Sequence, residues 1–218
     1  MTATVEASAK RACTREDYVE AATVLVEGYG PKILGFLTAT LRNQTEAREA
    51  YSMFAEDLWR GLPRFEWRSS ALTWCFTLAR HARNRYVRAH NRRRAREPLT
   101  PEGWLEDLVA KTRTRTPLHR RSELKARMRA LREQLPIDDQ MLLMLRIDQG
   151  LSFRDVARIL EPEESSDEAE GHARAAARLR KRLQLVKGRL RALAAEDGLL
   201  ALDPSLGRDG GASRGPSS

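Results

Sequence analysis

The sequence predicts an all-α protein of two small helical domains joined by a flexible linker, with a helix-turn-helix in the second domain. Apolar residues recur at the three- and four-residue spacing of an amphipathic helix through most of the 218 residues. No segment alternates between apolar and polar residues as a strand does. Residues 98–117 contain three prolines, a glycine and few apolar side chains, which is the composition of a linker. These observations divide the chain into a first unit at 15–97, a linker at 98–119 and a second unit at 120–200.

Four helices are expected in the first unit. Gly30-Pro31 should kink or break the helical stripe that begins near Tyr18, because proline removes a backbone donor and clashes with the preceding turn. A later helix closes near Gly61, and the last one follows Ser69 or Ser70, which favour the N-cap position. Residues 1–14 are expected to be a disordered N-terminus. The apolar stripes consist of Tyr18, Ala22, Leu25 and Tyr29, of Ile33, Leu37 and Leu41, of Ala50, Tyr51, Phe54 and Leu58, and of Leu72, Phe76 and Ala79.

The second unit shows the same periodicity in shorter helices. Pro136 should end the first of them, and Gly150 should end the next in the manner of a C-cap. Ser152 then opens a short helix at 152–160, and a long helix completes a helix-turn-helix. The Gly/Ser-rich tail at 201–218 is expected to be disordered. The stripes consist of Leu124, Met128, Leu131 and Leu135, of Met141, Leu142, Met144 and Leu145, of Phe153, Val156, Ala157 and Leu160, and of Leu179, Leu183, Val186, Leu190 and Leu193.

Positive charge is concentrated in one segment of each unit. Residues 67–96 carry nine arginines, no acidic residue and four aromatics, in a chain with a net charge of +9. A segment with so many positive charges and no negative one favours contact with a polyanion, either nucleic acid or an acidic membrane surface. A solvent-exposed arginine-rich helix whose aromatic side chains face the core would have the same pattern. The long C-terminal helix is also basic, and such helices serve membranes and partner proteins as well as DNA.

Several classes of function find no support in the sequence. Cys13 and Cys75 give neither a disulfide framework nor metal-ligand spacing, and the four histidines are scattered. No apolar run is long enough to span a bilayer, and the N-terminus lacks the apolar centre of a secretion signal. We therefore expect no catalytic residue, no metal and no cofactor, and a cytoplasmic protein that is not an enzyme, does not act on a small-molecule substrate and does not bind a membrane.

Three segments, taken in order, resemble bacterial RNA polymerase sigma factors of the extracytoplasmic-function (ECF) group. The conserved second domain of that family is similar to LPRFEWRSSALTWCFTLARHARNRYVRAHNRRR at 62–94. The fourth domain is similar to LREQLPIDDQMLLMLRIDQGLSFRDVARIL at 131–160, and its recognition helix to RLRKRLQLVKGRLRAL at 178–193. The resemblance implies an alternative sigma factor that binds core RNA polymerase and promoter DNA and directs transcription initiation. It leaves open whether an anti-sigma factor binds this chain.

The resemblance also implies three groups of site residues. The promoter −10 element would be contacted by Arg80, His81, Arg83, Asn84 and Arg88, and the −35 element by Arg178, Arg180, Lys181, Arg182, Gln184 and Lys187. Core polymerase would be bound by Glu46, Glu49, Ser52, Met53 and Glu56. Trp74, which lies beside the first group, is expected to belong to the core rather than to wedge into DNA.

Two departures from the family pattern bear on function. The family's docking helix usually reads Asp-Leu-Val-Gln-Glu, whereas this chain has Glu49-Ala50-Tyr51-Ser52-Met53. The polymerase contact must then be weaker or differently made. An insertion at 161–172 also separates the two helices of the helix-turn-helix, and the segment EPEESSDEAEGHA holds six acidic residues. It could swing away from DNA, lengthen the recognition helix through 173–177, or mask the basic face.

Two other functions remain open from the sequence alone. A dimeric helix-turn-helix regulator would use two copies of the second unit on a palindrome and would never touch polymerase. An RNA-binding or membrane-surface protein would use the arginines near residues 80–96 as a nonspecific patch. Two different basic units in one chain favour the sigma factor over the dimer, and dependence of binding on promoter sequence would separate it from the nonspecific protein.

Overall fold

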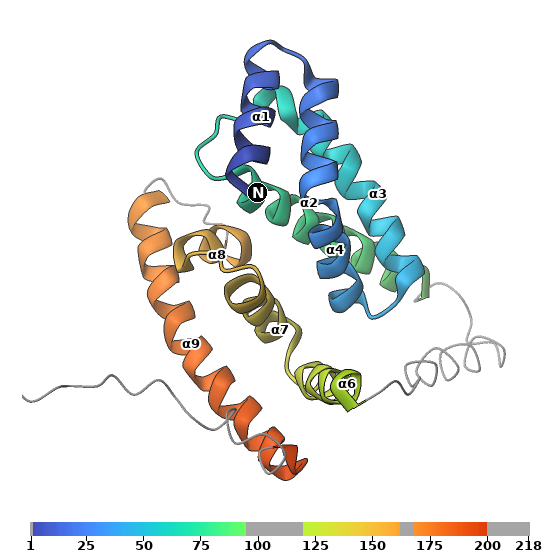
Figure 1. Ribbon diagram of the computed structural model, residues 1–218, viewed down its shortest axis with the longest axis vertical. Coiled ribbons are helices and arrows are strands. Elements are labelled where there is room, and N and C mark those ends of the chain that lie inside the picture. Colours follow the sequence, from blue (N-terminus) through green and yellow to red (C-terminus); the bar gives the residue numbers. More distant parts are fainter. Residues whose placement is uncertain (1, 95–119, 162–167, 200–218) are drawn as a thin grey trace, which may run out of the picture.

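The computed structural model describes residues 2–94, 120–161 and 168–199, and every regular element within them is helical. The predicted all-α fold is therefore confirmed. The first unit contains α1 (Thr2–Thr14), α2 (Tyr18–Leu41), α3 (Gln44–Gly61), the short 3-10 helix η1 (Leu62–Arg64) and α4 (Ala71–Arg94) (Figure 1). The predicted linker at 98–119 and the tail at 201–218 lie outside the described residues.

The N-terminus is an ordered helix, which corrects the prediction of disorder at 1–14. Helix α1 packs along α2 and buries Ala9 and Ala12 completely. Its Glu6 side chain accepts a hydrogen bond from the backbone N–H of Ala71 at 3.2 Å, and so satisfies a free donor at the start of α4. Because the buried residues of α1 are small alanines, the sequence of this segment gives little indication that it is buried. Tertiary packing, rather than a strong apolar stripe, is what holds α1 in place.

Close approach of α1 to α2 depends on Gly28. A Cβ at this position would lie 2.7 Å from both methyl groups of Val5, whereas a Cβ at Gly35 on the same helix would meet nothing within 4 Å. We expect Gly35→Ala to stabilise the protein by about 1 kcal/mol through helix propensity. Gly28→Ala should instead destabilise it, by about 1–3 kcal/mol relative to Gly35→Ala, because the stiff valine cannot move aside. Thermal unfolding of the two variants measures the difference, and equal melting temperatures would contradict the close contact.

Helix α2 continues through Pro31, so of the predicted kink or break the break does not occur. The proline costs the helix a hydrogen bond, but Ile33 and Leu37 just beyond it are fully buried and hold the backbone in place. Asp17 caps the helix by accepting from the N–H of Glu20 at 2.9 Å. Helix α4 starts where Ser70 accepts from the N–H of Thr73 at 3.1 Å, as the sequence predicted.

The second unit is built from short helices and one long one. It contains α6 (Arg120–Glu133), α7 (Ile137–Leu143), a π-helical turn η2 (Met144–Asp148), α8 (Phe153–Leu160) and α9 (Glu168–Glu196). Gly150 follows the π turn with a φ of +69°, a conformation that glycine adopts without strain. Ser152 caps α8 by accepting from the N–H of Asp155 at 3.1 Å. Helices α8 and α9 pack together as the predicted helix-turn-helix.

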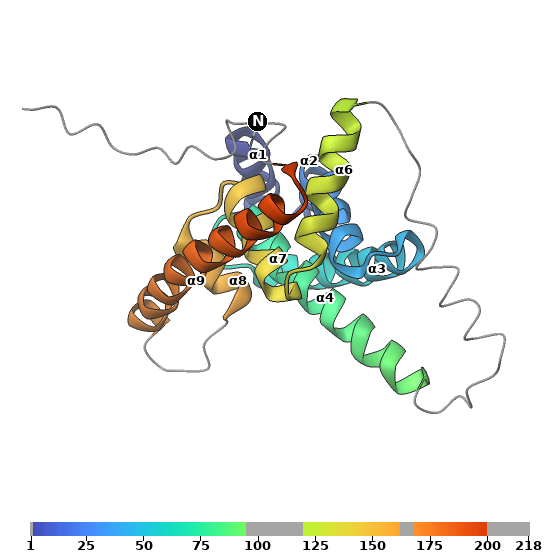
Figure 2. The ribbon, with the colours of Figure 1, turned by 90° about the horizontal axis from the view of Figure 1, so that it is seen from below.

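The two units touch each other. Helix α8 packs against α4 and α7 against α2, and Figures 1 and 2 both show the second unit beside the first. Buried side chains of both units belong to one hydrophobic cluster, which includes Phe76 and Val156. Arg42 at the end of α2 donates from Nη2 to the carbonyl oxygen of Glu133 at 2.5 Å. Separate helical units were predicted, and this packing between them was not.

Candidate nucleic-acid interface

Helix α4 presents the arginine-rich segment as one continuous helical surface. Arg80, Arg83 and Asn84 are half-buried, whereas His81 and Arg88 are exposed. Spacings of three, four and eight residues place Arg80, Arg83, Asn84 and Arg88 along one side of the helix. The structure thus brings together the residues that the resemblance assigns to the −10 element.

Arg80 and Arg83 are held in an environment that is unfavourable for a cation. The Nε atoms of both are buried, and neither has a hydrogen-bond partner among the described residues. Burial lowers the pKa of each guanidinium, and the negative charge of Asp138 on α7 opposes that shift. A buried donor without a partner costs on the order of 1–3 kcal/mol. These two side chains therefore retain unused capacity to donate to an anion.

Other arginines of the same segment are used to hold the fold. Arg85 makes a forked ion pair with Asp57 of α3, with nitrogen–oxygen distances of 2.6 and 3.2 Å. Such two-point pairs are the stronger and more directional kind. Arg85 consequently fixes α4 to α3, whereas Arg80 and Arg83 are close enough to α7 to be influenced by the charge of Asp138.

The surroundings of His81 lower the pKa of its imidazole. Desolvation lowers its pKa, and the nearby positive charges of Arg80, Arg85 and Arg88 lower it further, against a smaller opposite effect of Asp57. These effects favour the uncharged imidazole over the imidazolium. It can offer one hydrogen-bond donor and one acceptor to a neighbouring group.

The aromatics near α4 form a cluster rather than a row of exposed rings. Trp74 stacks on Phe65 with ring centroids 4.3 Å apart, and Phe65 also contacts Trp67 at 4.8 Å. Gly61 allows this arrangement, because a Cβ there would lie 2.8 Å from the Trp74 ring. Trp74 packs against the hydrophobic core, as predicted.

Helix α9 carries the second predicted group, and its arginines differ in what they contact. Arg178 pairs with Glu161 at 2.6 Å, and Arg182 donates from Nε to Asp139 of α7, also at 2.6 Å. Arg180 lies over the ring of Phe153. Lys181 and Gln184 are exposed, and Lys187 is half-buried. Arg182 therefore ties α9 to α7, while Arg180, Lys181 and Gln184 point away from the core.

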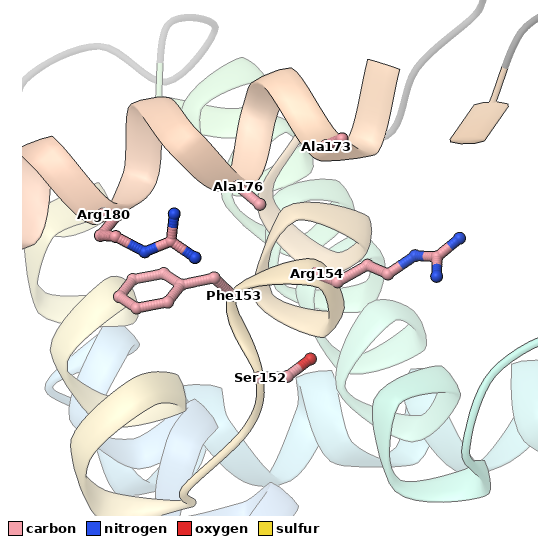
Figure 3. A pocket seen from close by; sticks show the side chains of 6 residues that line it. All are labelled: Ser152, Phe153, Arg154, Ala173, Ala176 and Arg180. Atoms are coloured by element: carbon pink, nitrogen blue, oxygen red, sulfur yellow. The ribbon is translucent and has the colours of Figure 1, made fainter. Parts of the chain in front are cut away.

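The ring of Phe153, at the start of α8, contacts two guanidinium groups. Arg146 and Arg180 each lie 5.0 Å from its ring centroid, a distance at which cation–π attraction is effective. Figure 3 shows Arg180 reaching from α9 over the Phe153 ring, with Arg154 extending on the other side of α8. Ser152, Ala173 and Ala176 complete an open pocket of about 510 Å³. Periodicity assigned Phe153 to an apolar stripe, and no signal in the sequence identified its arginine partners.

The acidic insertion lengthens the recognition helix, one of the three outcomes left open by the sequence. Helix α9 begins at Glu168, so residues 168–177 are helical. Residues 162–167 lie outside the described residues. At the start of the insertion, Glu161 pairs with Arg178 across a separation of seventeen residues. One carboxylate of the insertion thus occupies a predicted DNA-binding arginine.

Removing this carboxylate should strengthen DNA binding. Glu161→Gln frees Arg178 and removes a negative charge, so we expect affinity for a fluorescent DNA duplex to rise about two- to fivefold at low salt, given the small energy of exposed ion pairs. The gain should shrink as salt rises, because exposed charges are screened within about 10 Å at 0.1 M. Glu196→Gln, the same change at the far end of α9, is the control. Weaker binding by Glu161→Gln would show that the pair positions Arg178 instead of masking it.

The predicted polymerase-docking residues share the outer side of α3. Glu49, Ser52 and Glu56 are exposed, and Glu46 and Met53 are half-buried, with Met53 packed against the core. Trp59, one helical turn beyond Glu56, leaves 48% of its surface exposed. Sequence reasoning did not include it, since a tryptophan on an amphipathic helix is usually assigned to the core.

Within the described ranges the structure contains no group of three or more residues suited to hold a metal ion. The same part of the chain has no helix that is both long and apolar enough to cross a bilayer.

The two basic surfaces define a class of protein. A helical unit with a one-sided arginine helix, followed by a helix-turn-helix with a basic second helix, has the features typical of a nucleic-acid-binding protein. Residues 25–93 match the family model described as Sigma-70 region 2. The chain is also 27% identical over 146 residues to the RNA polymerase sigma-H factor of Pseudomonas aeruginosa, an alignment that covers 63% of this chain and 74% of that protein. The similarity is therefore to sigma factors, and residues 71–93 of α4 lie within the segment that matches sigma-70 region 2.

Proposed function

We propose that this protein is a sigma factor of the ECF type and directs core RNA polymerase to promoters with two separate elements. The first unit would dock on polymerase through α3 and bind the −10 element through α4. The second unit would bind the −35 element through α9. The protein would work in the cytoplasm by binding alone, without catalysing a reaction.

The main support is the position of the arginine face within the sigma-70 region 2 match. Arg80, Arg83 and Arg88 lie on α4 inside residues 25–93, and a helix-turn-helix with its own basic helix follows in the same chain. A dimeric repressor that reads a palindrome needs only one kind of reading unit. The asymmetric pair favours recognition of two unlike elements.

In this function the cations and the base contacts have different tasks. Arginine and lysine side chains gain affinity by releasing counterions from DNA phosphates, and this gain does not depend on sequence. Specificity requires contacts to base edges, which the exposed residues of α9 would make in a major groove. Joining two DNA-binding units of modest affinity in one chain raises the effective concentration of the second unit at its element once the first unit has bound.

The direct test combines polymerase binding with transcription. Purified chain should bind core RNA polymerase and produce run-off transcripts from a discrete subset of genomic fragments. Glu49→Lys, on the proposed docking side of α3, should weaken binding to polymerase. Glu27→Lys, the same charge change at an exposed position of α2, should not. Binding to DNA as a dimer, with no binding to polymerase, would favour the repressor instead.

A further inference from the structure

The ring of Phe153 has a fixed place beside the recognition helix. Phe153 is the first residue of α8, and it is half-buried and packs against the hydrophobic core. Ser152, the N-cap of α8, accepts from the N–H of Asp155 at 3.1 Å and donates to the Asp155 carboxylate at 2.5 Å. The capped first turn and the core together fix the ring, which lines the open pocket between α8 and α9 (Figure 3).

Arg180 of α9 depends on this ring for its position. Its Cζ atom lies 5.0 Å from the centroid of the Phe153 ring, and among the described residues its guanidinium takes part in no hydrogen bond or ion pair. Arg178 and Arg182, two residues away on either side, each pair with a carboxylate instead. Arg180 therefore keeps its N–H donors available while the ring restricts its side chain.

Contact with an aromatic ring prepares an arginine for binding. A freely rotating arginine side chain loses conformational freedom when it forms a base contact, and this loss weakens binding. Arginine stacks on aromatic faces because its guanidinium is planar, whereas the lysine ammonium is a compact charge on a flexible stem. A contact with the ring uses no hydrogen-bond acceptor. The ring of Phe153 can therefore orient Arg180 without occupying the donors that a base contact needs.

A second cation beside the ring makes the site suited to an electronegative ligand. Arg146 also lies 5.0 Å from the ring centroid, and its Nη1 donates to the carbonyl oxygen of Leu151 at 3.1 Å. Within the part of the chain that the structure describes, no carboxylate pairs with Arg146 or Arg180. The edge of guanine presents two acceptors, O6 and N7, to which arginine makes its most common specific contact. Both positive charges would attract such an edge.

Resting on the proposed function, we propose that Phe153 is a positioning residue for recognition of the −35 element. Its ring orients Arg180 for a two-point contact with a guanine edge in the major groove. Phe153 touches no base in this role and acts only through Arg180. Its contribution to DNA preference therefore exists only when Arg180 is present, and the specificity of α9 depends on a residue of α8.

The first measurement follows Arg180 in the full chain without DNA. The Nε–Hε signal of Arg180 in an NMR spectrum can be assigned by its loss in Arg180→Lys. Phe153→Leu keeps an apolar side chain against the core but removes the ring. We expect the signal to lose its ring-induced shift and to become more mobile in Phe153→Leu, and to keep both properties in Phe153→Tyr, which retains a ring. An unchanged signal in Phe153→Leu would overturn the proposal.

The second measurement is a cycle of DNA binding with Phe153→Leu, Arg180→Ala and the double variant. The probe is a fluorescent duplex that the wild-type chain selects from a randomised library, compared with the same duplex changed where Arg180→Ala relaxes the preference. Phe153→Leu should reduce discrimination between the two duplexes about two- to fivefold, the usual strength of an exposed cation–π contact. It should change nothing in the Arg180→Ala background, and Phe153→Tyr should retain the discrimination.

A purely structural role of Phe153 predicts a different pattern. Phe153→Leu would then weaken binding to both duplexes by the same factor, and the loss would be equal with and without Arg180. Such equal losses, or full discrimination by Phe153→Leu, would overturn the positioning role. Failure of the wild-type chain to bind core polymerase or to select any duplex would overturn the proposed function instead, and the NMR comparison would still show whether the ring orients Arg180.

Discussion

Cutting the chain between residues 100 and 118 should abolish promoter-directed initiation. In the proposed function each unit reads one element, and the covalent connection makes the second binding event intramolecular. A protease site placed in this segment allows the cut to be made after purification, so that both halves are present in equal amounts. We expect run-off transcription to be lost, while each half keeps its helical circular dichroism.

The uncut variant with the same inserted site is the control for the insertion itself. The contact between α4 and α8 could keep the halves associated after cleavage, but it does not replace a covalent connection that lets each unit reach its own element. Full transcription by the cleaved protein would contradict the need for a tether.

Arg180 and Arg182 should differ sharply when each is replaced by alanine, although both were predicted to contact the −35 element. Arg180 is exposed on α9, and its loss should cost about 1–3 kcal/mol of binding if it makes a two-point base contact. Arg182 pairs at 2.6 Å with Asp139, whose side chain is only 13% exposed. Arg182→Ala leaves that carboxylate without its partner, so we expect a loss of roughly 1–3 kcal/mol in the free energy of unfolding.

Two measurements distinguish these effects. Thermal unfolding should show a lower melting temperature for Arg182→Ala and little change for Arg180→Ala. Selection of preferred duplexes should show relaxed preference at one or two positions for Arg180→Ala and the wild-type preference for Arg182→Ala. The double variant Asp139→Asn with Arg182→Gln should recover part of the lost stability, because it removes the unpaired charge. The reverse pattern would mean that Arg182 reads bases and Arg180 supports the fold.

The predicted helices follow from short-range signals in the sequence. Apolar residues three and four apart share a face of any helix, so the stripes in α2, α3, α8 and α9 could be located without knowledge of their partners. Caps are equally local. Ser70 and Ser152 both accept from the N–H three residues further on, and Gly150 adopts the positive φ expected at the end of a helix. Pro31 is the exception, since burial of its neighbours overrides a local preference.

The candidate sites were only partly accessible to the same reasoning. Charge and resemblance identified which helices carry the basic surfaces, because an unbalanced run of arginines is visible in any sequence. They did not separate arginines that support the fold from those available to DNA. Arg85 and Arg182 meet their aspartates across 28 and 43 residues, and no periodicity encodes pairs at such separations.

By itself the sequence determined the helical class, the order of the two units, the positions of most helix ends and the concentration of positive charge on α4 and α9. All of these depend on interactions within a few residues or on composition. Only the tertiary structure decided that α1 is ordered against Gly28, that Phe153 contacts Arg146 and Arg180, and that the Nε atoms of Arg80 and Arg83 are buried without a hydrogen-bond partner in the described residues. These features arise where surfaces distant along the chain meet, and their energies come from close packing and from paired or unpaired charges that exist only once both surfaces are in place.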